Sequence, residues 1–276
     1  MTEKNPLVSL IIPVYNSAST INECIARVVK QTYQNWEIVI VDSNSSDGTH
    51  EIAAKWRKKL GRERFNYCNI RIRSRTKARN FGVTVSKGNR ILLLDSDNFL
   101  PKDFLNECVR ETGHDDFDGL RPCVREFWKH RSYLAKCWYY LIHGEENGEF
   151  REIPYPNFFK RDIWLKLGGQ NEKLEIGEDL EFTIRFERAG YSAPLLKRPI
   201  VMHNMPFSLK SVLFKTFFSK YPKKIFHKPL TASSREERSI WASRILFMLR
   251  NPKYVLGMTF LTLICTIGII VFKIGY

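Results

Sequence analysis

The sequence lacks the cysteine and histidine patterns that indicate a disulfide framework or a structural zinc site. Its six cysteines form no CxxC pair, and no histidine cluster joins them at zinc-ligand spacing. Several lie in apolar runs, where a free thiol behaves as a small hydrophobic side chain. We therefore expect reduced cysteines in a cytosolic compartment, at Cys24, Cys68, Cys108, Cys123, Cys137 and Cys265.

The chain also lacks an internal repeat, a low-complexity segment and the pattern of a secretory signal. Residues 1–6 are polar, and no charged segment followed by an apolar stretch opens the sequence. Hydrophobic residues make up 43% of the 276 positions, which is enough to bury a large core and excludes wholesale disorder.

Acidic residues are few beside the basic ones. The chain has 29 Asp and Glu against 44 Lys and Arg, a formal charge of +15. Scattered charge would serve only solubility, whereas a concentrated excess suits nucleic acid, an anionic lipid surface or a phosphate-bearing substrate. The basic residues become denser toward the C-terminal third, which favours lipid, and the recognisable nucleic-acid-binding modules are missing, so we expect no nucleic-acid partner.

A long uncharged run lies near the C-terminus. Residues 254–272 contain no charge over 19 positions, and a helix of roughly 20 residues crosses a bilayer core of about 30 Å. The alternative is a buried core helix. Arg244, Arg250 and Lys253 precede the run and only Lys273 follows it, so the main body is expected on the cytoplasmic side of a single-pass membrane protein.

Two basic, aromatic stretches lie before this run, at residues 207–220 and 239–250. Their amphipathic character suits either the membrane interface or packing on a soluble domain. We expect a catalytic domain over residues 1–204, amphipathic interface helices over 205–252 and a transmembrane helix over 253–276.

The first half alternates between apolar runs and segments with helical spacing. Such alternation predicts an α/β fold with a mixed, mainly parallel sheet between helices. We expect strands at 8–13, 36–41, 70–72 and 91–94. We expect helices opening with a capping box from Thr20 to Glu23, near Thr49, over 76–86 and at Pro101.

Polar residues follow three of these strands. They are Tyr15-Asn16, Asp42 and Asp95-Ser96-Asp97. Ligands of open α/β sheets bind beyond the carboxyl ends of the strands, so all three groups should line one crevice. Two carboxylates one residue apart repel each other unless a cation lies between them, and Mn²⁺ or Mg²⁺ takes carboxylate and phosphate oxygens together.

Five ordered segments together resemble the family 2 glycosyltransferases, whose fold is called GT-A. They are SLIIPVYN, VDSNSSDGT, KARNFG, LLLDSDN and GGQNEKLEIGEDLEF, and the resemblance extends from about Val8 to His203. It implies inverting transfer of a sugar from a nucleotide-diphosphate donor.

The resemblance also implies donor-binding residues. Pro13 and Tyr15 would flank the base, and Asp42 would hydrogen-bond it, often a uracil. A second Asp is common where this chain has Ser43, and a further Asp where it has Asn98. The remaining donor-side positions are Arg79, Asn80, Asp95 and Ser96, with Asp97 on the metal.

The pair Glu178-Asp179 matches the family's ED motif, in which the Asp is the catalytic base. A carboxylate opposite the leaving group can accept the acceptor's proton as the new bond forms. The alternative is a solvated acidic helix start. The apolar residues from Leu180 to Phe186 alternate as in a strand, but the family has a helix here, and Gly190 would end it.

His203 lies where many relatives have a histidine that completes the metal site. The alternative is a structural histidine whose hydrogen bonds are satisfied within the fold. Trp128 and Trp138, like Glu178, could face the acceptor; ordinary packing is the alternative for the aromatic residues.

The expected function is transfer of a sugar, from UDP more readily than from GDP, to a hydroxyl of a lipid-linked glycan or glycolipid. The polyprenyl-phosphate sugar synthases of the family are one alternative; they lack the ED motif, since a phosphate acceptor is already ionised. A non-catalytic nucleotide-sugar-binding membrane scaffold is another, which the intact Asp95, Asp97 and Asp179 disfavour.

Overall fold

The computed structural model describes residues 5–113, 117–127, 133–134, 137, 150–152, 156–174, 177–204, 252, 255–260 and 263. The chain divides into two compact units, one of residues 1–125 and 150–204 and the other of residues 126–149 and 205–276. The expected interface helices lie outside the described residues, apart from Pro252, as do Trp128 and Trp138.

Only part of the C-terminal apolar run is described. Residues 255–260 are helical. Within the ranges given above, no helix has the length and apolar character needed to cross a membrane.

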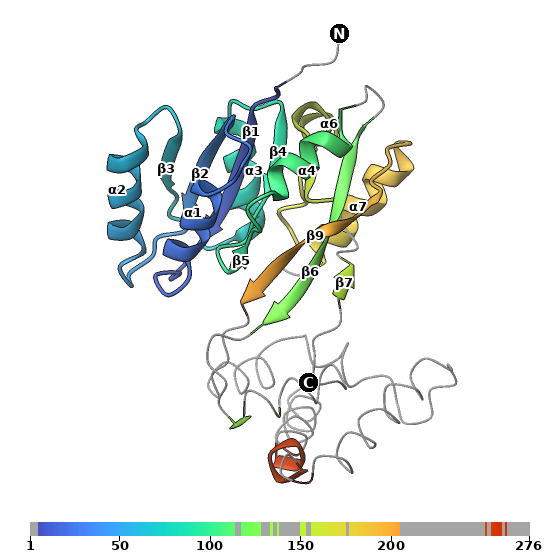
Figure 1. The fold of residues 1–276 in the computed structure, drawn as a ribbon. Coiled ribbons are helices and arrows are strands. Elements are labelled where there is room, and N and C mark those ends of the chain that lie inside the picture. The colour runs from blue at the N-terminus through green and yellow to red at the C-terminus, as the bar shows by residue number, and fades with distance from the viewer. Residues whose placement is uncertain are drawn as a thin grey trace, which may run out of the picture. The chain divides into compact units, whose positions relative to one another are not determined.

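The first unit is built on a mixed sheet with the strand order β3-β2-β1-β4-β8-β6-β9-β5, to which β7 adds by pairing with β6 (Figure 1). β3, β2, β1 and β4 run parallel, and β8 is antiparallel to both β4 and β6. The expected mixed α/β fold is confirmed. The strands are β1 Val8–Val14, β2 Trp36–Asp42, β3 Phe65–Asn69, β4 Arg90–Leu93, β5 Asn98–Phe99, β6 Gly119–Phe127, β7 Phe150–Glu152, β8 Phe158–Lys160 and β9 Leu195–Asn204.

Helices cover this sheet and bury its central strands. Every residue of β2 is buried, as expected for a parallel strand covered on both faces. Ala78 and Val83 of α3 join Ile11, Val39 and Ile91 in one apolar core. The helices are α1 Ile21–Val29, α2 Thr49–Leu60, α3 Arg75–Val85, α4 Phe104–Glu111, α6 Arg161–Lys166 and α7 Glu178–Arg188.

Three local predictions are wrong. The third strand is β3, Phe65–Asn69, rather than residues 70–72, and Ile72 is exposed beyond its end. The Thr20 hydroxyl donates to the Ser17 carbonyl at 3.3 Å and makes no capping bond to α1. α4 begins at Phe104 and not at Pro101, whose carbonyl accepts from the Phe104 N–H at 3.1 Å.

The segment after Gly177 is helical, as the family resemblance implied. Phe182 and Phe186 are buried one turn apart, whereas Leu180 and Ile184 are exposed, so burial follows the helical period of about 3.6 residues and not alternation. The helix ends before Gly190, whose φ of 85° suits glycine.

Candidate active site

The polar loops after β1, β2 and β4 are joined by hydrogen bonds. The Ser17 N–H donates to Thr49 Oγ1 at 2.8 Å, and Ser96 Oγ donates to Ser17 Oγ at 3.0 Å. The Asn16 N–H donates to Ser45 Oγ at 2.9 Å. The carboxyl ends of these parallel strands therefore present one polar edge, at which ligands of α/β sheets bind.

Residues expected near the nucleotide base lie at the ends of β1 and β2 or just beyond them. Asp42 is buried, and its carboxylate accepts from the Ser45 N–H and Oγ at 2.8 and 2.7 Å and from the Tyr67 hydroxyl at 2.6 Å. Tyr15, just beyond Pro13, is exposed, and the Arg73 guanidinium lies 4.7 Å from its ring centroid. Asp42 thus shapes its own loop, and its role toward a base stays a prediction.

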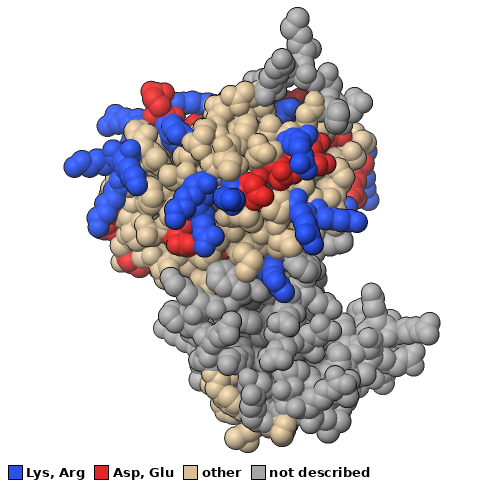
Figure 2. Space-filling view, viewed as in Figure 1, with Lys and Arg blue, Asp and Glu red and all other residues tan. Residues whose placement is uncertain are grey.

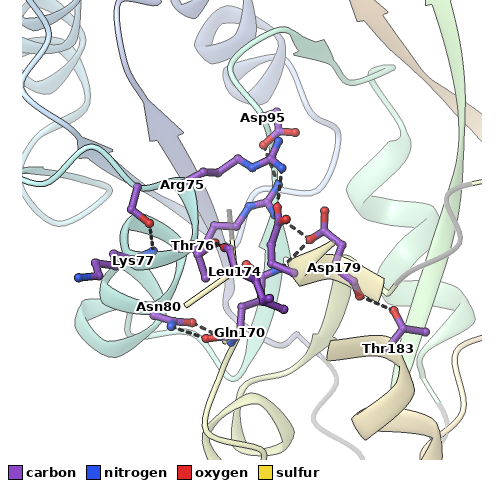
Figure 3. Close-up of polar contacts among 12 residues, drawn as sticks. Arg75, Thr76, Lys77, Asn80, Asp95, Gln170, Leu174, Asp179 and Thr183 are labelled. Carbon is purple, nitrogen blue, oxygen red and sulfur yellow. Dashed lines mark hydrogen bonds and ion pairs between the residues drawn. The ribbon is translucent and has the colours of Figure 1, made fainter. Parts of the chain in front are cut away.

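Arg79 joins the two carboxylates that matter most for the expected chemistry. It is 2% exposed, donates from Nη2 to Asp95 Oδ1 at 2.9 Å and from Nη1 to Asp179 Oδ1 at 2.8 Å. Arg75, one turn earlier on α3, pairs with Glu178. Figure 3 shows Arg75, Asp95 and Asp179 converging from α3, the end of β4 and the start of α7.

This arrangement shifts the pKa values of the two carboxyl groups in opposite directions. Burial alone would raise the pKa of Asp95, but Arg79 and Arg75 outweigh it and lower that pKa. Burial raises the pKa of Asp179; Arg79 opposes the rise and Glu178 adds to it, so the pKa stays above its ordinary value. Asp95 is therefore held as an anion, while Asp179 is the more basic group.

Asp97 and His203 are brought together by strand pairing. β5 and β9 are antiparallel with Asn98 opposite His203, and the Asn204 N–H donates to the Asp97 carbonyl at 2.8 Å. His203 Nε2 then lies 3.3 Å from Asp97 Oδ2. The family resemblance implies both residues at one metal site, and this strand pairing is what brings them within reach of each other.

The donor set suits a hard divalent cation. Asp97 Oδ1 is buried and has no hydrogen-bond partner among the described residues, as expected of a carboxylate oxygen that serves as a metal ligand. The described ranges hold no group of three or more potential His, Cys, Asp or Glu ligands. Mg²⁺ and similar ions are commonly held by one or two carboxylates together with substrate phosphates, so two protein ligands fit.

Asn80 does not point toward the other expected donor contacts. Its amide exchanges hydrogen bonds with the Gln170 backbone, Nδ2 to the carbonyl and the N–H to Oδ1, both at 2.9 Å. Gln170 and Arg75 were not among the sequence-predicted site residues. Both lie within or beside conspicuous segments, GGQNE and KARNFG, and that proximity was the only available signal.

Comparison with known proteins places the chain in a family. The model of "Glycosyl transferase family 2" matches residues 9–171. The glycosyltransferase AglE of Haloferax volcanii is 38% identical over 204 residues, 70% of this chain and 65% of AglE. The chain spans only part of the length of several relatives, for example 37% of GlyG and 15% of GlyA, both from Streptococcus pneumoniae.

Two solved structures share the fold. TarS residues 1–349 from S. aureus, in complex with UDP, gives a TM-score of 0.56 at 21% identity over 86% of this chain and 70% of that chain. The mannosyltransferase PcManGT from Pyrobaculum calidifontis, with GDP-Man and Mn²⁺, gives 0.61 at 17% identity over 96% and 87%. Because the family model matches more than half of the chain, the chain belongs to glycosyl transferase family 2.

Proposed function

We propose that the chain is an inverting glycosyltransferase. It moves a sugar from a nucleotide-diphosphate donor to a hydroxyl of a membrane-associated acceptor, such as a lipid-linked glycan or glycolipid. The observation that carries the proposal is the pair Asp95 and Asp179, held by one buried arginine with their pKa values shifted apart. Two carboxylates separated in this way suit one electrostatic and one proton-accepting role.

Asp179 is the proposed base. The acceptor oxygen attacks the anomeric carbon, and the bond from that carbon to the diphosphate oxygen breaks with its electrons leaving on the diphosphate. Asp179 takes the hydroxyl proton as the new bond forms. A single displacement of this kind inverts the anomeric centre.

Asp97 and His203 would hold Mn²⁺ or Mg²⁺, which when bound neutralises charge on the departing diphosphate. Support comes from the unpartnered Asp97 Oδ1 and from the Mn²⁺ in the structure of PcManGT.

We propose a UDP-sugar before a GDP-sugar. The reason is the resemblance at Asp42, since the matching aspartate of the family often binds uracil. TarS has been crystallised with UDP and PcManGT with GDP-Man, so the donor panel must contain both bases.

A hydroxyl acceptor is proposed because a base is present. A polyprenyl phosphate is already ionised and would not require Asp179. Asp179→Asn should therefore abolish transfer to a lipid-linked sugar. Unimpaired synthesis of a prenyl-phosphate sugar by this variant would instead identify a polyprenyl-phosphate synthase.

The first experiment is a donor screen. Full-length protein is incubated with UDP- and GDP-sugars, acceptor lipid extract and Mn²⁺ or Mg²⁺, and release of nucleoside diphosphate is followed. We expect release from one donor that is lost on EDTA treatment and in Asp97→Ala. A chain that binds a nucleotide sugar but transfers nothing under any condition would indicate the non-catalytic scaffold.

Membrane anchoring with the catalytic unit on the cytoplasmic side is also a proposal, supported by the uncharged run at 254–272 and the basic residues before it. The full chain should remain in the membrane fraction after a carbonate wash, and a chain ending at residue 252 should not. Retention of both to the same extent would contradict a single spanning segment.

A further inference from the structure

Gln170 makes a direct contact with the proposed base. It lies between α6 and α7, is 3% exposed, and its side-chain Nε2 donates to Asp179 Oδ1 at 2.5 Å. The reverse orientation of the amide would place its oxygen against a carboxylate oxygen, so chemistry assigns the nitrogen to this contact. Figure 3 shows Gln170 lying between Asn80 and Asp179.

Asn80 fixes the backbone from which this side chain extends. Its amide bonds the Gln170 carbonyl and N–H, each at 2.9 Å, and Nδ2 also reaches Glu172 at 3.0 Å. Asn80 belongs to α3, which packs on the central strands β1 and β2. The backbone at Gln170 is therefore held against a helix that packs on the central strands, and not by its own loop alone.

The donors to the Asp179 carboxylate all meet one oxygen. Oδ1 accepts from Arg79 and from Gln170, while no hydrogen bond or ion pair reaches Oδ2 from any residue that the structure describes. Two donors on Oδ1 fix the rotation of the carboxylate. They leave Oδ2 as the oxygen that can receive a proton.

The hydrogen-bonding capacity of the Gln170 side chain is only partly used. Its buried Oε1 has no hydrogen-bond partner within the described ranges, and an unsatisfied buried acceptor costs free energy. Gln31 differs: it is 1% exposed, its Nε2 donates to the carbonyls of Arg27 and Pro101, and its Oε1 accepts from the Leu105 N–H. The two buried glutamines thus form a matched pair, one fully satisfied and one not.

We propose that Gln170, held by Asn80, is a positioning residue that orients the Asp179 carboxylate so that Oδ2 accepts the proton of the acceptor hydroxyl. This inference rests on the proposed function. A neutral amide fixes the carboxylate without the large loss of basicity that a second cation in contact would cause. The charged groups that act on Asp179 are Arg79, Glu178, Arg75 and Asp95.

The test compares Gln170→Leu with Gln31→Leu in the full-length protein, using the donor found in the screen. Gln170→Leu should lower kcat by about 10- to 100-fold, the range for a lost hydrogen bond to a charged group, with the donor KM and the melting temperature nearly unchanged. The acid limb of kcat/KM should move to higher pH, because the ionised carboxylate has lost a donor. Gln31→Leu should lower the melting temperature and leave the acid limb in place.

Asn80→Ala provides the second arm. If Asn80 acts through Gln170, the double variant should be no slower than Gln170→Leu alone. Fully additive losses would overturn the link. An unchanged kcat and acid limb in Gln170→Leu would overturn the positioning role.

Asp179→Asn separates the two proposals. If it abolishes transfer while Gln170→Leu behaves as wild type, only the positioning role fails. If Asp179→Asn is as active as wild type, or if the wild type transfers nothing, the proposed function fails and this inference fails with it.

Discussion

At the residue scale, the site depends on Arg79, a buried cation among carboxylates. Arg79 contacts Asp95 and Asp179 directly and lies 3.8 Å from Glu178. Breaking a buried ion pair from one side leaves uncompensated charge, and this costs much more than loss of an exposed pair.

Arg79→Met should therefore be strongly destabilising. We expect a loss of about 3–5 kcal/mol in the free energy of unfolding, measured by urea denaturation. Arg27→Met is the matched control, because Arg27 pairs with Glu23 on an exposed face of α1 and such i,i+4 pairs contribute about 0.3–0.5 kcal/mol. Equal losses in the two variants would contradict a special role for the buried arginine.

The pH dependence of transfer should report Asp179. Its pKa is raised by burial and, among its neighbours, by Glu178, so activity should fall with decreasing pH earlier than for an ordinary aspartate. Glu178→Gln removes one negative neighbour and should move the acid limb of kcat/KM to lower pH.

Glu181→Gln controls for position on α7. Glu181 pairs with Arg185, which lowers the pKa of Glu181, and it is not among the groups that act on Asp179. The acid limb should stay in place in this variant. A limb that moves equally in both would show that another group controls the pH dependence.

At the element scale, the turn after α6 depends on close approach to α3. Gly168 and Gly169 have φ of 74° and 69°. A Cβ on Gly169 would lie 2.5 Å from Asn80 Oδ1, whereas a Cβ on Gly168 would meet nothing within 4 Å. Both glycines therefore need a positive φ, and they differ only in whether an added Cβ would collide with Asn80.

Gly169→Ala should be more destabilising than Gly168→Ala. Both introduce a side chain at positive φ, at a cost of about 1 kcal/mol or more. Only Gly169→Ala also displaces Asn80, so it alone should reproduce the kcat loss expected for Gln170→Leu. Thermal unfolding and initial rates measure the two effects. Identical behaviour of the two variants would show that the close contact between Gly169 and Asn80 is not important.

At the scale of the whole molecule, charge is unevenly distributed along the chain. Residues 205–276 contain 12 Lys and Arg against 2 Glu. On the face of the described residues in Figure 2, basic and acidic side chains are interspersed. The excess of Lys and Arg over acidic residues, which suits binding to an anionic lipid surface, therefore belongs largely to the second unit.

Binding to vesicles should accordingly be salt-sensitive. We expect a chain ending at residue 252 to sediment with vesicles containing phosphatidylglycerol in low salt and to be released as salt rises, because screening weakens surface electrostatics. Vesicles of phosphatidylcholine alone provide the control. Equal, salt-independent sedimentation with both lipids would contradict electrostatic binding.

Sequence by itself located the central strands and nominated the polar positions at their ends, whose roles stay predictions. Unbroken Val, Ile and Leu runs identified β1, β2 and β4, and carboxylates at strand ends identified Asp42, Asp95 and Asp97. These features are local, since burial on both faces and the polar strand end are written in consecutive residues. The weaker β3 was misplaced because its half-buried residues lack that pattern.

Only the tertiary structure decided which polar groups meet. Arg79 pairs with Asp179, 100 positions further along the chain, and Asn80 with Gln170, 90 positions further along. His203 and Asp97, which the resemblance assigns to one metal site, meet through the pairing of β9 with the two-residue strand β5. Sheet order and helix packing choose these partners, and no periodicity along the chain records them, so the positioning of Asp179 could be found only in three dimensions.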